Sequence, residues 1–181
     1  MNPANLPFDS EAMLQGLRSW VECESPTWDA AAVERMLGLA AREMAIMGAT
    51  IERIAGRQGF AGCVRARFPH PKQGQPGILI ASHLDTVHPV GTIEKLQWRR
   101  EGNKCFGPGI FDMKGGNYVF LEAMRQIGKA GLTTPLPEPA VLRYGLKAVM
   151  SPSSPVYVPP KADTNLARFV AGFTRNATNS A

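Results

Sequence analysis

Cysteine is scarce in this sequence, and long apolar runs are missing. The three cysteines, Cys23, Cys63 and Cys105, are odd in number and widely spaced. This pattern excludes a disulfide framework and fits reduced thiols, so we expect a cytoplasmic protein. No run approaches the ~18 apolar residues of a membrane span. Residues 1–10 have neither the basic start nor the apolar centre of a signal peptide. The sequence therefore predicts no membrane association.

A dominant charge of one sign is also missing. The 181 residues include 20 basic and 15 acidic side chains, and the basic ones are scattered along the chain. A nucleic-acid-binding surface normally needs a concentrated basic patch, so nucleic acid is not an expected partner. A hydrophobic content of 44% is typical of a folded chain, and this length suffices for the core of one domain.

The residues that carry chemistry concentrate in the stretch 77–116. It opens with the apolar run 78–81, which predicts a strand buried on both faces of an α/β sheet. His83 and Asp85 follow where this strand ends. Alternate residues of an extended backbone point to the same side, so the two side chains can face one site. Ligands of open α/β sheets bind beyond the carboxyl ends of the strands, which is where this pair falls.

The second half of the stretch, residues 107–116, predicts a rigid loop that presents a carboxylate. Two glycines and a proline force a tight turn, Asp112 lies on it, and a helical pattern follows. Zinc binds histidine nitrogen and carboxylate oxygen, and a histidine ligand usually donates its other ring N–H to an acceptor. The pattern therefore predicts a metal site with His83 and Asp112 as ligands and Asp85 as the acceptor that orients His83.

These two segments also carry a resemblance to a known family. Residues 83–87 (HLDTV) and 107–116 (GPGIFDMKGG) resemble the two N-terminal signatures of a family of two-zinc hydrolases. That family includes glutamate carboxypeptidases, acetylornithine deacetylase, succinyl-diaminopimelate desuccinylase and aminoacylase. The resemblance extends from about residue 14 to about residue 137. It implies a three-layer α/β/α catalytic domain with a mixed sheet, here truncated and without the family's smaller lid and dimerisation domain.

The resemblance further implies roles for single residues. His83 would bind one zinc ion, Asp112 would bridge two zinc ions, and Asp85 would be the catalytic-site residue that holds the His83 imidazole. Such enzymes hydrolyse an amide bond next to an amino-acid carboxylate, using a metal-activated water and a general-base glutamate. A small peptide or N-acyl amino acid is therefore the expected substrate. His88 lies near the motif but before Pro89 in a turn, and the resemblance assigns it no metal role.

The sequence lacks the later residues that such enzymes need. No Glu-Glu pair occurs in the chain, no histidine follows His88, and only Glu138 and Asp163 are acidic after Gly131. With two family-type ligands instead of the usual three or four, we expect weak metal binding and little or no turnover. The alternative function is a non-catalytic remnant or a weak metal-binding module.

The composition changes near Pro137, where the resemblance stops. We therefore divide the chain into a partial catalytic domain, residues 1–137, and a divergent tail, residues 138–181, which is rich in proline and expected to pack poorly. Two explanations are open. A shift of the reading frame near Pro137 would supply a foreign tail, or the tail is native to a short, divergent relative.

Local patterns predict the remaining elements. Apolar spacing predicts helices over residues 9–23 and 28–47, the first capped by Asp9 or Ser10 and the second by Thr27. Further elements are expected as strands over 49–54 and 63–68, a hairpin over 98–106, a helix over 116–127, one strand or short helix within 140–150, and helical turns within 166–173. Arginines alternate with apolar residues over 63–68, which predicts an edge or half-exposed strand.

Overall fold

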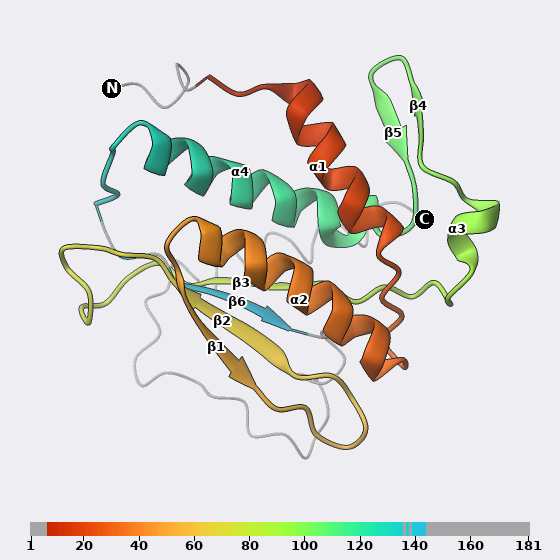
Figure 1. The fold of residues 1–181 in the computed structure, drawn as a ribbon, viewed down its shortest axis with the longest axis horizontal. Coiled ribbons are helices and arrows are strands. Elements are labelled where there is room, and N and C mark those ends of the chain that lie inside the picture. The colour runs from red at the N-terminus through yellow and green to blue at the C-terminus, as the bar shows by residue number, and fades with distance from the viewer. Residues whose placement is uncertain (1–6, 136, 138, 144–181) are drawn as a thin grey trace, which may run out of the picture. The chain divides into compact units, whose positions relative to one another are not determined.

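The computed structural model describes residues 7–135, 137 and 139–143. Its elements, in chain order, are α1 (Ser10–Glu22), α2 (Ala30–Ile46), β1 (Thr50–Ile54), β2 (Cys63–Arg67), β3 (Ile80–His83), α3 (Thr92–Lys95), β4 (Arg99–Glu101), β5 (Lys104–Phe106), η2 (Ile110–Lys114), α4 (Gly115–Lys129) and β6 (Pro139–Arg143) (Figure 1). No helix in the described part of the chain is long and apolar enough to cross a membrane. The helical turns expected within 166–173 lie outside the described residues.

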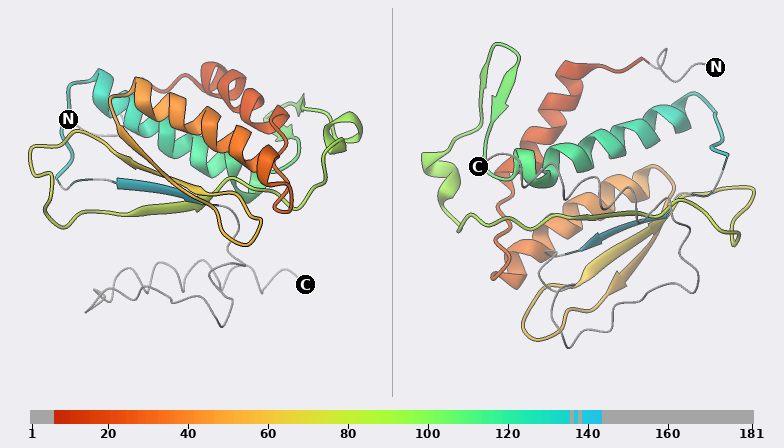
Figure 2. Two further views of the ribbon diagram at one scale, coloured as in Figure 1. Left: turned by 60° about the horizontal axis from the view of Figure 1, so that its bottom comes forward. Right: turned by 180° about the vertical axis from the view of Figure 1, so that it is seen from behind.

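The main sheet is mixed, as the sequence predicts. Its four strands have the order β1-β2-β6-β3. β2 pairs antiparallel with both β1 and β6, whereas β3 pairs parallel with β6. Helices α1, α2 and α4 lie together on one face of this sheet (Figure 2). The α/β class is thereby confirmed. The helices α1, α2 and α4 of the described residues all cover this one face.

Helix positions follow their predictions, with one correction at the start of α2. Asp9 caps α1, because its Oδ1 accepts hydrogen bonds from the amides of Glu11 and Ala12 at 3.0 and 3.1 Å. The cap of α2 is Asp29, which accepts from the amide of Ala32 at 2.9 Å. The expectation that Thr27 caps this helix is therefore wrong, because its hydroxyl has a different partner, described below.

Two expectations about strand environment are also corrected. The strand of the 77–116 stretch is not buried on both faces, because Ala81 is exposed and Ile80 is only half-buried. Among the described residues β3 pairs on one side only, with β6. The strand over 63–68 is half-exposed as predicted, but it is not an edge strand, because β2 lies between β1 and β6. Its outward arginines, Arg65 and Arg67, pair with Glu52 on β1.

The predicted hairpin is confirmed as β4 and β5. Glu101 faces Lys104 in the register, so Gly102 and Asn103 form the turn. Within the predicted 140–150 element, β6 is a strand. The rest of that element lies outside the described residues.

The core lies between the sheet and the three helices. Trp20 of α1, Met36 and Leu37 of α2, and Leu121 of α4 are each at most 2% exposed. Trp20 also stacks edge-on against Tyr118, with ring centroids 5.4 Å apart. This packing fixes α4, whose N-terminal end directly follows the Asp112 turn.

Candidate metal centre

His83, Asp85 and Asp112 come together at the end of β3. His83 is the last residue of that strand, and Asp112 lies in the η2 turn just before α4. His83 Nε2 is 3.0 Å from Asp112 Oδ1. On the other side of the ring, His83 Nδ1 is 3.2 Å from Asp85 Oδ1 and 3.1 Å from the Asp85 carbonyl oxygen. The imidazole is thus held between two carboxylates.

The three side chains differ sharply in exposure. The Asp85 side chain is 3% exposed and the His83 side chain 13%, whereas that of Asp112 is 74% exposed. The site therefore opens to solvent on the Asp112 side and is closed behind Asp85. The hydrogen bond to Asp85 raises the pKa of His83 to about 9, against the effect of burial, and Asp112 contributes in the same direction. The two carboxylates thus make the surroundings of the imidazole favourable for a positive charge.

The donor atoms that converge here fit one zinc ion in chemistry and spacing. Metal bonds of about 2.0–2.1 Å with a tetrahedral angle place two ligand atoms roughly 3.3 Å apart. The separation of His83 Nε2 and Asp112 Oδ1, 3.0 Å, is close to that value. Within residues 7–135, 137 and 139–143, however, no group of three or more histidine, cysteine or acidic side chains could hold a metal ion. His88, half-buried in the following bend, completes no such group.

The Asp112 turn is attached to α1 by a buried lysine. Lys114 is 1% exposed, and its ammonium group donates to the carbonyl oxygens of Trp20 and Cys23 at 3.0 and 2.8 Å. Both carbonyls belong to the C-terminal end of α1, where a cation is favourable. Burial lowers the pKa of Lys114 to about 8. This role cannot be seen in the sequence, because a lysine in a motif gives no local sign of burial.

Two further segments support His83 and Asp85. The side-chain amide of Asn117, in the first turn of α4, donates to the His83 carbonyl oxygen at 2.7 Å. Residues 25–27 lie beside residues 84–86, and the Thr27 hydroxyl is 2.5 Å from Asp85 Oδ2. Sequence reasoning assigned Thr27 to a helix cap, because the position before a helical pattern is the usual place for such a hydroxyl.

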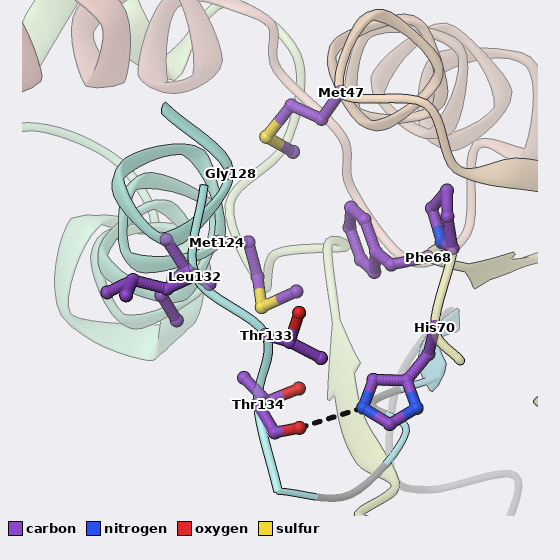
Figure 3. Close-up of a pocket in the computed structure, with 10 residues that line it drawn as sticks. Met47, Phe68, His70, Met124, Gly128, Leu132, Thr133 and Thr134 are labelled. Atoms are coloured by element: carbon purple, nitrogen blue, oxygen red, sulfur yellow. Dashed lines mark hydrogen bonds between the residues drawn. The ribbon is translucent and has the colours of Figure 1, made fainter. Parts of the chain in front are cut away.

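A separate pocket lies away from these residues, at the C-terminal ends of α2 and α4. This cavity of about 210 Å³ is lined mainly by Met47, Phe68, His70, Met124 and Thr134 (Figure 3). His70 is half-buried in a loop, and its Nε2 is 2.8 Å from the Thr134 carbonyl oxygen. Neither of the predicted metal ligands lines this pocket.

The chain is similar in sequence to known proteins. Residues 79–137 match the profile of peptidase family M20/M25/M40. The chain is 30% identical over 129 residues to carboxypeptidase G2 of Pseudomonas sp. strain RS-16, a match that covers 68% of this chain and 30% of that protein. It is 37% identical over 71 residues to acetylornithine deacetylase of Pectobacterium carotovorum, covering 35% of this chain and 18% of that protein.

The fold is shared with solved structures. Human carnosine dipeptidase 1 superposes with a TM-score of 0.65 at 17% identity, over 76% of this chain and 32% of that chain. The chain thus spans about a third of the length of this structure and of carboxypeptidase G2.

Proposed function

We propose that this chain, which belongs to peptidase family M20/M25/M40, carries two ligands of a zinc site, His83 and Asp112, with Asp85 as the residue that orients His83. The observation that carries the proposal is the 3.0 Å separation of His83 Nε2 and Asp112 Oδ1. It is supported by the chemistry of the donors, because imidazole nitrogen and carboxylate oxygen are ordinary zinc ligands.

The reaction proposed for the complete site is hydrolysis of an amide bond next to an amino-acid carboxylate. Bound zinc supplies a Lewis acid that polarises a carbonyl group and lowers the pKa of water. Asp85 accepts a hydrogen bond from the Nδ1–H group of His83, with its carbonyl oxygen at 3.1 Å and its carboxylate at 3.2 Å, and thereby leaves Nε2 directed toward Asp112. The substrate class, a small peptide or an N-acyl amino acid, is supported by the names of the matching relatives, a carboxypeptidase and a deacetylase.

This chain by itself is proposed to bind zinc weakly and to turn over little or no substrate. Its sequence contains no Glu-Glu pair and no histidine after His88. Two protein ligands are fewer than the three or four of ordinary zinc sites. A non-catalytic remnant, or a weak metal-binding module, is the second candidate, and the absence of a third ligand among the described residues favours it. We also propose a cytoplasmic location, which the odd number and wide spacing of the three cysteines support.

Zinc titration and an amide-hydrolysis assay test this proposal together. We expect wild-type chain to bind Zn²⁺ weakly, His83→Ala to abolish that binding, and His70→Ala, a histidine of the separate pocket, to leave it unchanged. Hydrolysis of an N-acyl-glutamate is expected to stay at background. Turnover that His83→Ala removes would show an active hydrolase instead. Absence of any Zn²⁺ binding by the wild-type chain would contradict the metal site.

A further inference from the structure

We infer that Thr27 is a positioning residue for this site, because its hydroxyl fixes the Asp85 carboxylate and, through it, the His83 imidazole. The contacts from Thr27 to Asp85 and from Asp85 to His83 support this positioning role by their distances alone. Its effect on zinc affinity rests on the proposed function.

Residues 25–27 pair with residues 84–86 through backbone hydrogen bonds. The Thr86 amide donates to the Ser25 carbonyl oxygen at 2.7 Å, and the Thr27 amide donates to the Thr86 carbonyl oxygen at 3.0 Å. The Ser25 hydroxyl also donates to the Leu84 carbonyl oxygen at 2.7 Å. The ladder between β3 and β6 ends at His83. Residues 25–27 therefore hold the backbone immediately beyond that strand, where Asp85 lies.

The two carboxylate oxygens of Asp85 lie beside different side chains. Thr27 Oγ1 is 2.5 Å from Asp85 Oδ2, while Asp85 Oδ1 is 3.2 Å from His83 Nδ1. A hydroxyl has one proton, and the Thr86 carbonyl oxygen is more distant from Thr27 Oγ1, at 3.3 Å. The proton therefore goes to the carboxylate, which is also the stronger acceptor. With both oxygens engaged, the plane of the carboxylate is fixed.

The position of the Asp85 carboxylate affects the orientation of the His83 imidazole. His83 Nδ1 donates a hydrogen bond to the Asp85 carbonyl oxygen at 3.1 Å, and Asp85 Oδ1 is its second acceptor at 3.2 Å. If the carboxylate turned, the ring could donate to that carbonyl alone, and a tilted ring would carry Nε2 away from Asp112. Asp85 is 3% exposed, so bulk water cannot readily replace the lost hydroxyl. The Thr27 hydroxyl thus keeps Asp85 Oδ1 beside Nδ1, so that the ring is held by both acceptors.

The Thr27 hydroxyl does not cap α2. Asp29 caps that helix. Removal of the Thr27 hydroxyl therefore tests the site without removing a helix cap.

The experiment compares Thr27→Val, which keeps the shape but loses the hydroxyl, with Thr27→Ser, which keeps the hydroxyl. Thr92→Val is the matched control, because the Thr92 hydroxyl donates to Pro89 at 2.7 Å on an exposed turn. In metal-free protein labelled at histidine, the Nδ1 proton of His83 is assigned with His83→Ala and observed by NMR. We expect Thr27→Val to shift this signal upfield and to speed its exchange with water. Thr27→Ser and Thr92→Val are expected to retain the wild-type signal.

Zinc titration of the same variants gives the second readout. We expect Thr27→Val to lower Zn²⁺ affinity about tenfold, the lower end of the usual cost of losing an outer partner of a metal ligand. An unchanged His83 Nδ1 signal in Thr27→Val would overturn the inference. A wild-type chain that binds no Zn²⁺ would overturn the proposed function, while the NMR comparison would still decide the positioning role. If Thr27→Val does not fold, Thr27→Ala compared with Thr27→Ser decides it.

Discussion

His83 Nε2 lies 3.0 Å from Asp112 Oδ1, although His83 ends a strand and Asp112 occupies the turn before a helix. The contact joins the two halves of the 77–116 stretch at one point on the surface. Each half alone offers one candidate metal ligand. The two ligands come together only because β3 and α4 pack on the same core.

Asp112→Asn tests this contact directly. The substitution keeps the size of the side chain and removes its negative charge, so we expect Zn²⁺ affinity to fall at least about tenfold. The Asp112 side chain is 74% exposed, so stability should change by no more than about 0.5 kcal/mol. Competition with a chromophoric chelator measures the affinity. Glu94→Gln, at another exposed carboxylate, is the control, and equal affinities in the two variants would contradict the prediction.

Gly109 and Gly116 should respond in opposite ways to alanine. Gly109 has φ of 72°, and a Cβ there would lie 2.5 Å from Thr86 Cγ2. Gly109→Ala should therefore destabilise the protein by about 1–3 kcal/mol. Gly116 lies in the first turn of α4 with no atom within 4 Å of an added Cβ, so Gly116→Ala should stabilise by about 0.5–1 kcal/mol. Thermal unfolding measures both changes, and a common sign would refute the assignment of strain to Gly109.

Lys114→Met should weaken the attachment of the Asp112 turn to α1. The two carbonyl oxygens of Trp20 and Cys23 would lose their donor, while the cost of burying an ammonium group would disappear. We expect a net loss of about 1–3 kcal/mol in the free energy of unfolding, measured with urea. Lys129→Met replaces an exposed lysine at the end of α4 and should change stability by less than about 0.5 kcal/mol. A higher free energy of unfolding for Lys114→Met would show that the cost of burying the ammonium group exceeds the contribution of its two hydrogen bonds.

Glu43→Gln should reveal an ion-pair network that links the three helices. Glu43 accepts from the Trp20 indole at 2.6 Å and pairs with Arg125 at 2.9 Å, and Arg125 also contacts Glu122. The two donors bond different oxygens of Glu43, and glutamine replaces one of these oxygens with an NH2 group, so one donor would lose its acceptor at a cost of about 1–3 kcal/mol.

The matched control for this network is Glu22→Gln on the surface of α1. It breaks an exposed pair with Arg18, in which the side chains are 50% and 45% exposed. Such pairs contribute little, so the change should stay below about 0.5 kcal/mol. Equal urea midpoints for the two variants would contradict a structural role for Glu43.

Much of the secondary structure follows from local signals. The Asp9 cap, the turn at Gly102 and Asn103, and the apolar spacing of the helices all act within a few residues. The prediction that β3 is buried on both faces is wrong, because an apolar run does not show which strands and layers will cover it. Thr27 was misassigned for a similar reason, since a hydroxyl before a helix has several possible partners.

The sequence by itself determined the α/β class, the end of β3 as the place of the site, and His83, Asp85 and Asp112 as its candidate residues. These features depend on residue type and on the two-residue repeat of extended chain. Only the tertiary structure decided that β6 lies between β2 and β3, that Lys114 is buried against α1, and that the Thr27 hydroxyl reaches Asp85. Thr27 and Asp85 are 58 residues apart, and contacts over such separations are set by how whole elements pack rather than by local dihedral preference.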